Sequence, residues 1–187
     1  HPGREVLHSR DGSATEAYAP SAIPNDRFHV MPRAMPTALV REIIEGYGDA
    51  ALRLKKGGLE GVEIVASQGY LPSQFLNPKV NVRTDEYGGS FENRLRFVRE
   101  IIENIRSKVG DFVIGMRISG NEKDTTGLDD KQAADICEAL DGSDSADYFS
   151  VCGGTSATLG GSVHIAPPMF FDAGYVEPYA ANVKSRV

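Results

Sequence analysis

The chain has few of the residues that mark specialised classes of protein. Its 187 residues include two cysteines and no tryptophan. Cys137 and Cys152 are too few for a disulfide framework or a metal cluster, and we expect both to be reduced structural thiols. No run reaches the roughly 18 apolar residues that a membrane-spanning helix needs. These absences argue against a disulfide-rich secreted domain, a metal-cluster protein and a membrane protein.

Positive charge is also scarce. The 20 Lys and Arg residues are outnumbered by 26 Asp and Glu residues, which gives a formal net charge of -6. This balance argues against a nucleic-acid-binding surface and favours a protein that acts on a small-molecule substrate. We therefore expect a cytoplasmic protein without nucleic-acid or membrane partners. The sequence leaves open whether it forms a homo-oligomer.

The two ends are unusual for a complete protein. His1 replaces an initiator Met, and no signal-peptide pattern follows it. The last helical pattern, after Tyr179, stops where a strand is expected. Residues 1–187 suit one ordinary domain in length, and both ends have the character of the edges of a fragment.

Apolar periodicity predicts strands and helices in alternation. Stripes of apolar residues at helical spacing, flanked by capping residues such as Ser90, alternate with short apolar runs. The expected helices cover about 37–56, 90–109, 129–140 and from about 176, and the expected strands cover 62–65, 112–118 and 148–151. Residues 1–35, 69–89 and 152–168 are expected loops. Alternation of this kind predicts an α/β fold with a parallel sheet.

Two architectures provide such a sheet: an open doubly wound sheet and a (β/α)8 barrel. No Gly-rich phosphate fingerprint follows any of the expected strands, which disfavours a dinucleotide-binding fold. A barrel of this kind needs about 250 residues. If the chain is a barrel, it is an incomplete one.

The segment from Gly69 to Phe97 is the most informative part of the chain. It follows the apolar strand Val62–Val65 and is rich in Asn, Arg, Asp and Tyr before the next helix starts. In parallel α/β proteins, ligands bind at the loops that follow the carboxyl ends of strands. A long, polar and ordered loop at that place indicates a functional site.

Several motifs resemble the Old Yellow Enzyme family of NADH:flavin oxidoreductases. They are His1-Pro-Gly-Arg4, Ala19–Ala22, Pro32–Ala34, Gly61-Val-Glu-Ile64, Gly69-Tyr-Leu71, Gln74–Pro78, Asn81, Arg83, Asp85, Tyr87-Gly-Gly-Ser90, Glu92-Asn-Arg94, Arg96-Phe97 and Gly115-Met-Arg-Ile-Ser119. The resemblance covers most of the chain. It implies a (β/α)8 barrel that binds FMN and takes hydride from NADH or NADPH.

The resemblance also implies which parts of the barrel are present. The expected strands correspond roughly to barrel strands 4 to 6, so strands 1, 2, 7, 8 and most of 3 would be absent. The family holds the FMN phosphate in the loops after the last two strands. The chain would then carry part of the ring side of the site and little of its phosphate side.

Arg117 is the first residue to which the resemblance gives a role. By resemblance it lies near N1 and O2 of the flavin, where its charge would stabilise the reduced ring. The alternative is an ion pair with a core carboxylate such as Glu63, because a guanidinium at the end of a buried strand needs an anionic partner.

Substrate-binding positions depart from the usual family pattern. Where most ene-reductases of the family have His followed by His or Asn, this chain has Val65 and Gln68. Val65 cannot donate a hydrogen bond, and Gln68 is a neutral amide. The string resembles the 2,4-dienoyl-CoA reductase and amine-demethylase branch, which includes trimethylamine dehydrogenase-like proteins. In the dienoyl-CoA reductases of that branch, the tyrosine that matches Tyr70 is the proton donor; the alternative for Tyr70 is a buried packing tyrosine.

Two histidines complete the candidate site. His1 would lie near the flavin by resemblance, as a cofactor-binding residue, although a first residue is often frayed. His164 follows the third expected strand and could contact substrate or line the entrance, but it matches no family position residue for residue. Arg83, Asp85, Glu92, Asn93 and Arg94 look like a structural lattice that fixes the long loop, with Glu63 as a further partner. No metal ligands are expected.

Two hypotheses for function follow. The first is an FMN-dependent oxidoreductase fragment that transfers hydride between NAD(P)H, flavin and an activated alkene or an N-methyl amine. The second is a truncated, non-catalytic barrel fragment that cannot hold FMN by itself, because its curved sheet would have unpaired edges. A 4Fe-4S cluster and a second flavin domain, which the branch often has, would lie beyond this sequence. We expect the fragment alone to be inactive.

Overall fold

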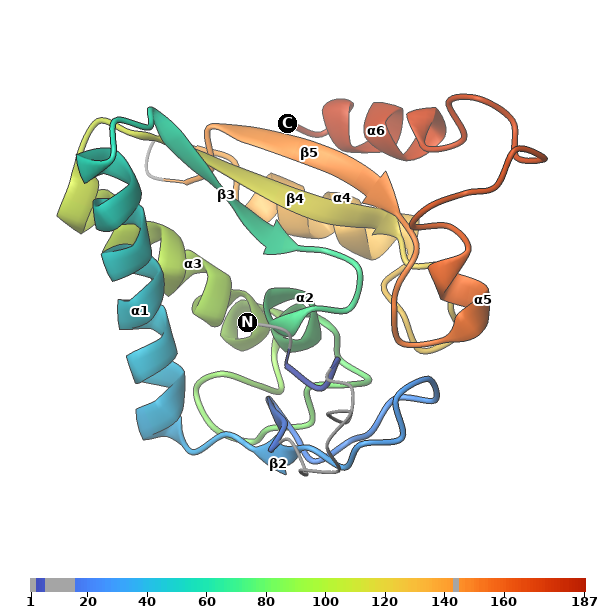
Figure 1. Cartoon of the computed structure of the whole chain (residues 1–187), viewed down its shortest axis with the longest axis horizontal. Coiled ribbons are helices and arrows are strands. Elements are labelled where there is room, and N and C mark those ends of the chain that lie inside the picture. Colours follow the sequence, from blue (N-terminus) through green and yellow to red (C-terminus); the bar gives the residue numbers. More distant parts are fainter. Residues whose placement is uncertain (1–2, 6–15, 143–144) are drawn as a thin grey trace.

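A parallel three-stranded sheet forms the centre of the molecule. The computed structural model describes residues 3–5, 16–142 and 145–187. Strands β3 (Gly61–Ala66), β4 (Val113–Asn121) and β5 (Tyr148–Gly153) lie side by side in sequence order (Figure 1). Each successive strand is joined to the last through a helix, as the alternating pattern predicts.

Helices pack against one face of this sheet. They are α1 (Thr37–Lys56), α3 (Phe91–Val109), α4 (Asp130–Ala139) and α6 (Glu177–Lys184). Helix α1 contacts α3 and β3, whereas α4 contacts β4 and α6 (Figure 1). The expected bounds of the longer helices agree with the structure to within about one residue. The α/β prediction with parallel strands is confirmed.

The two faces of β4 differ sharply. Ile114, Met116 and Ile118 are fully buried and join one hydrophobic cluster with the helices. Alternate residues of a strand point to opposite faces, so Gly115 and Arg117 lie on the other face. The apolar composition of this strand predicted cover on both faces. Within the described residues helices cover only one face, yet Gly115 and Ser119 on the other face are also buried. Cover along the whole second face stays a prediction.

The expected long loop contains a helix that periodicity did not predict. Helix α2 (Leu71–Leu76) follows β3 after four residues, and all six of its residues are buried. Pro72 occupies the first turn, where proline is tolerated. Phe75 stacks on Phe97 of α3 with 4.0 Å between ring centroids. Burial of this short segment, rather than a long apolar stripe, accounts for the helix.

Two further short elements depart from the expected loops. Residues 1–35 were expected to form a loop, but Tyr18–Ala19 (β1) and Arg33–Ala34 (β2) pair as two short parallel strands. The loop 152–168 contains the four-residue helix α5 (Leu159–Ser162). None of the described helices is long and apolar enough to cross a membrane.

The polar loop after α2 is fixed by Arg83. Its Nε donates to Asp85 Oδ1 at 2.9 Å, and its Nη1 donates to the carbonyls of Pro20 (2.9 Å) and Met35 (2.6 Å). Asp85 also accepts from the Thr37 hydroxyl at 3.1 Å. One buried guanidinium therefore ties the loop to the segments that precede α1.

Other predicted members of the lattice behave differently from one another. Asn93 donates to the carbonyl of Gly88 and Arg94 donates to that of Leu76, as a structural role requires. Glu92 instead pairs with Arg99 on the exposed side of α3. Glu63 does not belong to this lattice, and its partners lie on the sheet.

The N-terminus of α4 is stabilised by a reciprocal cap. The Asp129 side chain accepts from the Gln132 amide at 2.8 Å, and the Gln132 side chain accepts from the Asp129 amide at 3.1 Å. We expect Asp129→Ala to lower the free energy of unfolding by about 1 kcal/mol. Chemical denaturation measures this. Asp130→Ala, one residue further along, is the control and should cost less, so equal losses would show that the cap does not matter.

Candidate functional site

Three side chains form a charged cluster on the helix-free face of the sheet. Arg117 of β4 donates from Nε to Glu63 Oε1 of β3 at 2.8 Å. Tyr148 of β5 donates its hydroxyl to Glu63 Oε2 at 3.2 Å. Burial, together with the charge of Glu63, raises the pKa of Tyr148. The cluster joins all three strands and gives the guanidinium a fixed orientation.

The ion pair that was the alternative for Arg117 is therefore present. It uses only the Nε atom, and within the described residues neither terminal nitrogen of Arg117 has a hydrogen-bond partner. The Arg117 side chain is 43 % exposed, on the face without helices. A pair with Glu63 and a contact to an anionic ligand are thus compatible. The flavin contact stays a prediction.

Gln68 is held at the carboxyl end of β3 by both neighbouring chain segments. Its amide donates to Ser119 Oγ of β4 at 2.9 Å, and its carbonyl accepts from the Ser156 amide at 2.9 Å. Gln68 has a φ of 58°, which is unusual for a residue other than glycine. Ser119 lies two residues beyond Arg117 on the same face, about 7 Å along the strand. The structure therefore brings Gln68 and Arg117 together near the carboxyl ends of the strands.

Val65 and Tyr70 lie on either side of Gln68. Val65 is level with Arg117 in the sheet register and is 40 % exposed. Tyr70 immediately precedes α2, is half-buried, and donates its amide to the Ser67 carbonyl at 3.1 Å. Both residues are therefore near the carboxyl end of β3, where Gln68 lies. The proton-donor role of Tyr70 stays a prediction.

His164 lies beside the loop that follows β5. A Cβ atom on Gly154 would come within 2.9 Å of His164 Cβ, so the two backbones approach closely. The imidazole stacks edge-on against Phe171, with 5.1 Å between centroids, and its Nδ1 is 3.1 Å from the Gly160 carbonyl oxygen. These contacts place His164 beside the carboxyl end of β5. The predicted flavin neighbour His1 lies outside the described residues.

Both cysteines are free thiols, as expected. Burial raises the pKa of Cys137 to about 12, and burial also raises that of Cys152. Cys152 Sγ is 3.9 Å from Ser119 Oγ at the end of β5. Both thiols are thus protonated near neutral pH and poorly suited to act as nucleophiles. Within the described residues, no group of three or more His, Cys, Asp or Glu side chains could hold a metal ion.

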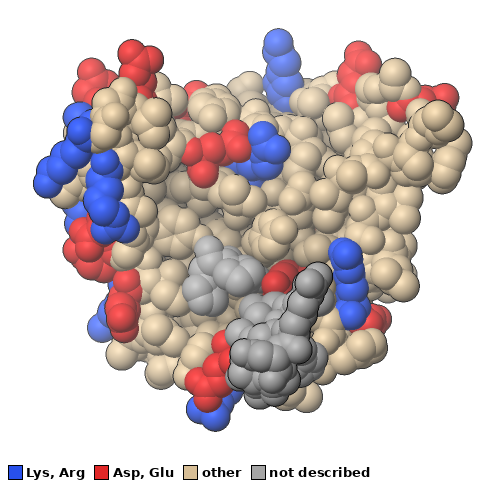
Figure 2. All heavy atoms as spheres, in the orientation of Figure 1, with Lys and Arg blue, Asp and Glu red and all other residues tan. Residues whose placement is uncertain are grey.

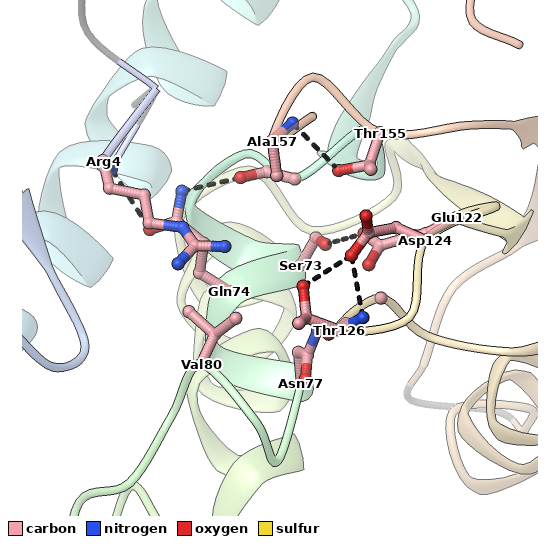
Figure 3. Close-up of a pocket in the computed structure, with 12 residues that line it drawn as sticks. Arg4, Ser73, Gln74, Asn77, Val80, Glu122, Asp124, Thr126, Thr155 and Ala157 are labelled. Atoms are coloured by element: carbon pink, nitrogen blue, oxygen red, sulfur yellow. Dashed lines mark hydrogen bonds between the residues drawn. The ribbon is translucent and has the colours of Figure 1, made fainter. Parts of the chain in front are cut away.

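A small cavity with polar lining residues lies beside the segments that follow β3, β4 and β5 (Figure 3). Arg4, Ser73, Glu122 and Thr155 are among its lining residues. Glu122 is fully buried, accepts from the Ser73 hydroxyl at 2.7 Å, and has a pKa raised by burial. The cavity volume of about 10 Å³ is enough for one water molecule. It is too small for a flavin or a substrate, and we read it as structural.

Sequence reasoning missed three polar residues that hold Gln68 and Glu63 in place. Ser119, Tyr148 and Ser156 each bond a residue from another strand or loop, and none was proposed as a site residue. Ser119 lies near the carboxyl end of β4 and Ser156 in the loop after β5, and these places were the available signal. Tyr148 is the first residue of β5, where no such signal exists. Figure 2 shows acidic and basic side chains mostly around the outline of the molecule in this view, with one adjacent acidic and basic group nearer its centre.

Comparisons with known proteins agree with this geometry. Residues 2–151 match the model of the NADH:flavin oxidoreductase / NADH oxidase family. The chain is 36% identical over 187 residues to a multifunctional alkene reductase/demethylase OYE of Caballeronia cordobensis, covering 97% of this chain and 27% of the relative. An NADPH dehydrogenase of Bacillus velezensis is 45% identical over 129 residues, covering 69% of this chain and 36% of the relative.

Solved structures share the fold. Morphinone reductase superimposes with a TM-score of 0.73 at 26% identity, over 100% of this chain and 51% of that chain. The chain therefore spans about a quarter to a half of the length of these relatives. Its three strands correspond to part of their (β/α)8 barrel. The chain belongs to the NADH:flavin oxidoreductase / NADH oxidase family.

Proposed function

We propose that this chain forms the flavin-ring side of an FMN-dependent oxidoreductase site. The reaction is hydride transfer from NADH or NADPH, through the flavin, to an activated alkene, or from an N-methyl amine to the flavin. The single observation that carries the proposal is the half-exposed Arg117 guanidinium. Its terminal nitrogens lack partners among the described residues, and Glu63 fixes its orientation.

The residues present fit the ring of FMN better than its phosphate. A guanidinium offers two parallel donors, which suits a planar acceptor pair and the negative charge of a reduced ring. Bound FMN supplies the hydride chemistry. Arg117 would hold the negative edge of the ring, and the Glu63 carboxylate would keep the guanidinium from rotating.

The other predicted residues would contact substrate. The side-chain amide of Gln68 can donate a hydrogen bond to a carbonyl oxygen of the substrate, and Val65 offers an apolar surface beside it. Tyr70 would move a proton through its hydroxyl, which can both donate and accept a hydrogen bond. His164 would line the entrance. An apolar residue at position 65 favours substrates that need only one hydrogen-bond donor at this place.

A second candidate is a partial barrel that does not hold FMN without further strands. Two hollows flank the free edges of the described sheet: one of about 250 Å³ beside β3 and α1, and one of about 400 Å³ beside β5 and α6. Unpaired edges with apolar hollows favour association or loss of structure. Both candidates are consistent with a chain that carries the flavin-ring side of the site but not its phosphate side.

Flavin binding separates the two candidates. We expect the protein at its full natural length to retain FMN during purification and to lose the flavin absorbance when NADH or NADPH is added without oxygen. A cyclic enone added to this reduced protein should reoxidise the flavin, whereas an N-methyl amine added to the oxidised protein, without NADH or NADPH, should reduce it. The compound that changes the flavin absorbance identifies the substrate class. A colourless protein that does not quench FMN fluorescence would contradict the proposal.

A further inference from the structure

The backbone of Gln68 adopts an unfavourable conformation that its neighbours must stabilise. Its φ of 58° lies in the left-handed region, which side chains other than glycine rarely adopt. Such conformations persist when surrounding contacts determine them, and they concentrate at functional sites. The contacts around Gln68 are therefore informative about how its side chain is aimed.

Ser156 supplies two of these contacts. Both its amide (2.9 Å) and its hydroxyl (2.8 Å) lie within hydrogen-bond distance of the Gln68 carbonyl oxygen. The amide of Gln68 is held independently by Ser119. The loop after β5 thus fixes the carbonyl side of Gln68, and β4 fixes its amide side.

The Ser156 hydroxyl has a second acceptor within reach. Its Oγ is 3.0 Å from Glu5 Oε2 and 2.8 Å from the Gln68 carbonyl oxygen. A hydroxyl carries one proton and can donate to one of the two at a time. While Glu5 is ionised, the carboxylate competes for that proton. When Glu5 is protonated, it can donate to Ser156 Oγ, and the serine proton is free for Gln68.

The surroundings of Glu5 make both protonation states accessible. The Glu5 side chain is 1% exposed, and Arg4 Nε approaches its Oε1 at 3.8 Å. Arg4 donates from Nη1 to the carbonyls of Ile23 and Pro24, so it is not a close partner of the carboxylate. Burial raises the pKa of Glu5 to about 7, with Ser156, Arg4 and Asn25 opposing that shift.

One acidic group facing Glu5 comes from another element. Glu122, at the end of β4, adds to the rise in the pKa of Glu5. Asp124 and Asp26 act on the adjacent Arg4, together with Glu122 and Glu5. The loop after β5 contributes the neutral hydroxyl of Ser156.

We propose that Ser156 is a positioning residue for Gln68, and that its hydroxyl transmits the protonation state of Glu5 to the Gln68 peptide. The inference rests on the proposed function in so far as Gln68 contacts substrate there. With Glu5 protonated, two hydrogen bonds hold the Gln68 carbonyl and its side chain is well aimed. With Glu5 ionised, one of them is weakened and substrate binding becomes poorer.

Nuclear magnetic resonance tests the coupling without any flavin. In ¹⁵N-labelled protein the Gly69 amide shares a peptide group with the Gln68 carbonyl, and the Ser156 amide donates to it. We expect both signals to shift between pH 5 and pH 9 with one midpoint near that of Glu5. Glu5→Gln should abolish the shift. Ser156→Ala should reduce the shift at Gly69 to the direct effect of the Glu5 carboxylate, which lies close to Gly69, whereas Ser156→Thr should keep it.

Ser162→Ala is the matched control, because Ser162 belongs to the same loop and donates to the Leu159 carbonyl instead. It should titrate like the unmodified protein. An unchanged inflection in Glu5→Gln, a full response in Ser156→Ala, or flat signals in the unmodified protein would each overturn the proposal.

Kinetics of the FMN-loaded protein give a separate reading. As the pH rises through the same midpoint, we expect KM for the substrate to rise about fivefold, as for the loss of one net hydrogen bond. We expect kcat to change little. Glu5→Gln should hold KM at its low-pH value. If the protein shows no turnover while the resonance shifts follow the predicted pattern, the proposed function fails and the coupling stands.

Discussion

Replacing Arg117 by Met should slow reduction of bound FMN by NADH or NADPH about 100-fold, the loss typical of removing one donor to a developing negative charge. Met keeps most of the volume and removes the charge. The structure predicts a large effect because the Arg117 side chain has terminal nitrogens without partners and faces the helix-free side of the sheet. Stopped-flow absorbance under anaerobic conditions measures the rate.

Arg99→Met is the control for this experiment. Arg99 lies on α3 and pairs with Glu92 on the outer surface, far from the charged cluster in the fold. Flavin content must be measured for both variants, so that weaker binding is distinguished from slower reduction. Equal reduction rates in the two variants at equal flavin content would show that Arg117 does not act on the ring.

Replacing Arg83 by Met should cost about 2–3 kcal/mol of unfolding free energy, as for the loss of a charged donor that several acceptors share. The Arg83 side chain is 9% exposed and bonds Asp85 and two backbone carbonyls. Its loss leaves the carboxylate and both carbonyls without their donor. Urea denaturation followed by circular dichroism measures the change.

Arg41→Met is the matched control. Arg41 pairs with Glu86 in the same region at 3.1 Å, but its side chain is 69% exposed. Exposed pairs contribute little, so its denaturation midpoint should stay near that of the unmodified protein. Similar shifts for both variants would contradict the structural role assigned to Arg83.

The same ion pair predicts a pH dependence of stability. Arg83 lowers the pKa of Asp85 from its ordinary value of 3.8 to about 2. A depressed carboxyl pKa stabilises the folded state above the unfolded-state pKa. The contribution is therefore present above about pH 4 and is lost as the pH falls toward 2. In Asp85→Asn, the loss of stability over this interval should be smaller.

The long helices could be predicted because local and global signals agree. Apolar stripes, the Ser90 cap and the stop at Gly57 each act within a few residues, and α1 and α3 have the expected bounds. Helices α2 and α5 were missed because six and four residues are too short for a periodic stripe. The burial that stabilises α2 comes from packing against α3, which local sequence does not reveal.

The contacts of the site depend on register and on distant parts of the chain. The pair between Arg117 and Glu63 was among the alternatives, because charge at a buried strand end needs a partner. That Tyr148 joins them follows from the alignment of β5 with β4, 85 residues from Glu63. Ser156 and Glu5 are 151 residues apart. Such contacts require the fold before they can be read.

A crystal structure of the full natural-length protein with FMN tests the central claim most directly. The account predicts that an Arg117 terminal nitrogen lies about 3 Å from N1 or O2 of the flavin ring, while Nε keeps its bond to Glu63. A bound ring elsewhere, with the Arg117 guanidinium turned to solvent, would contradict it.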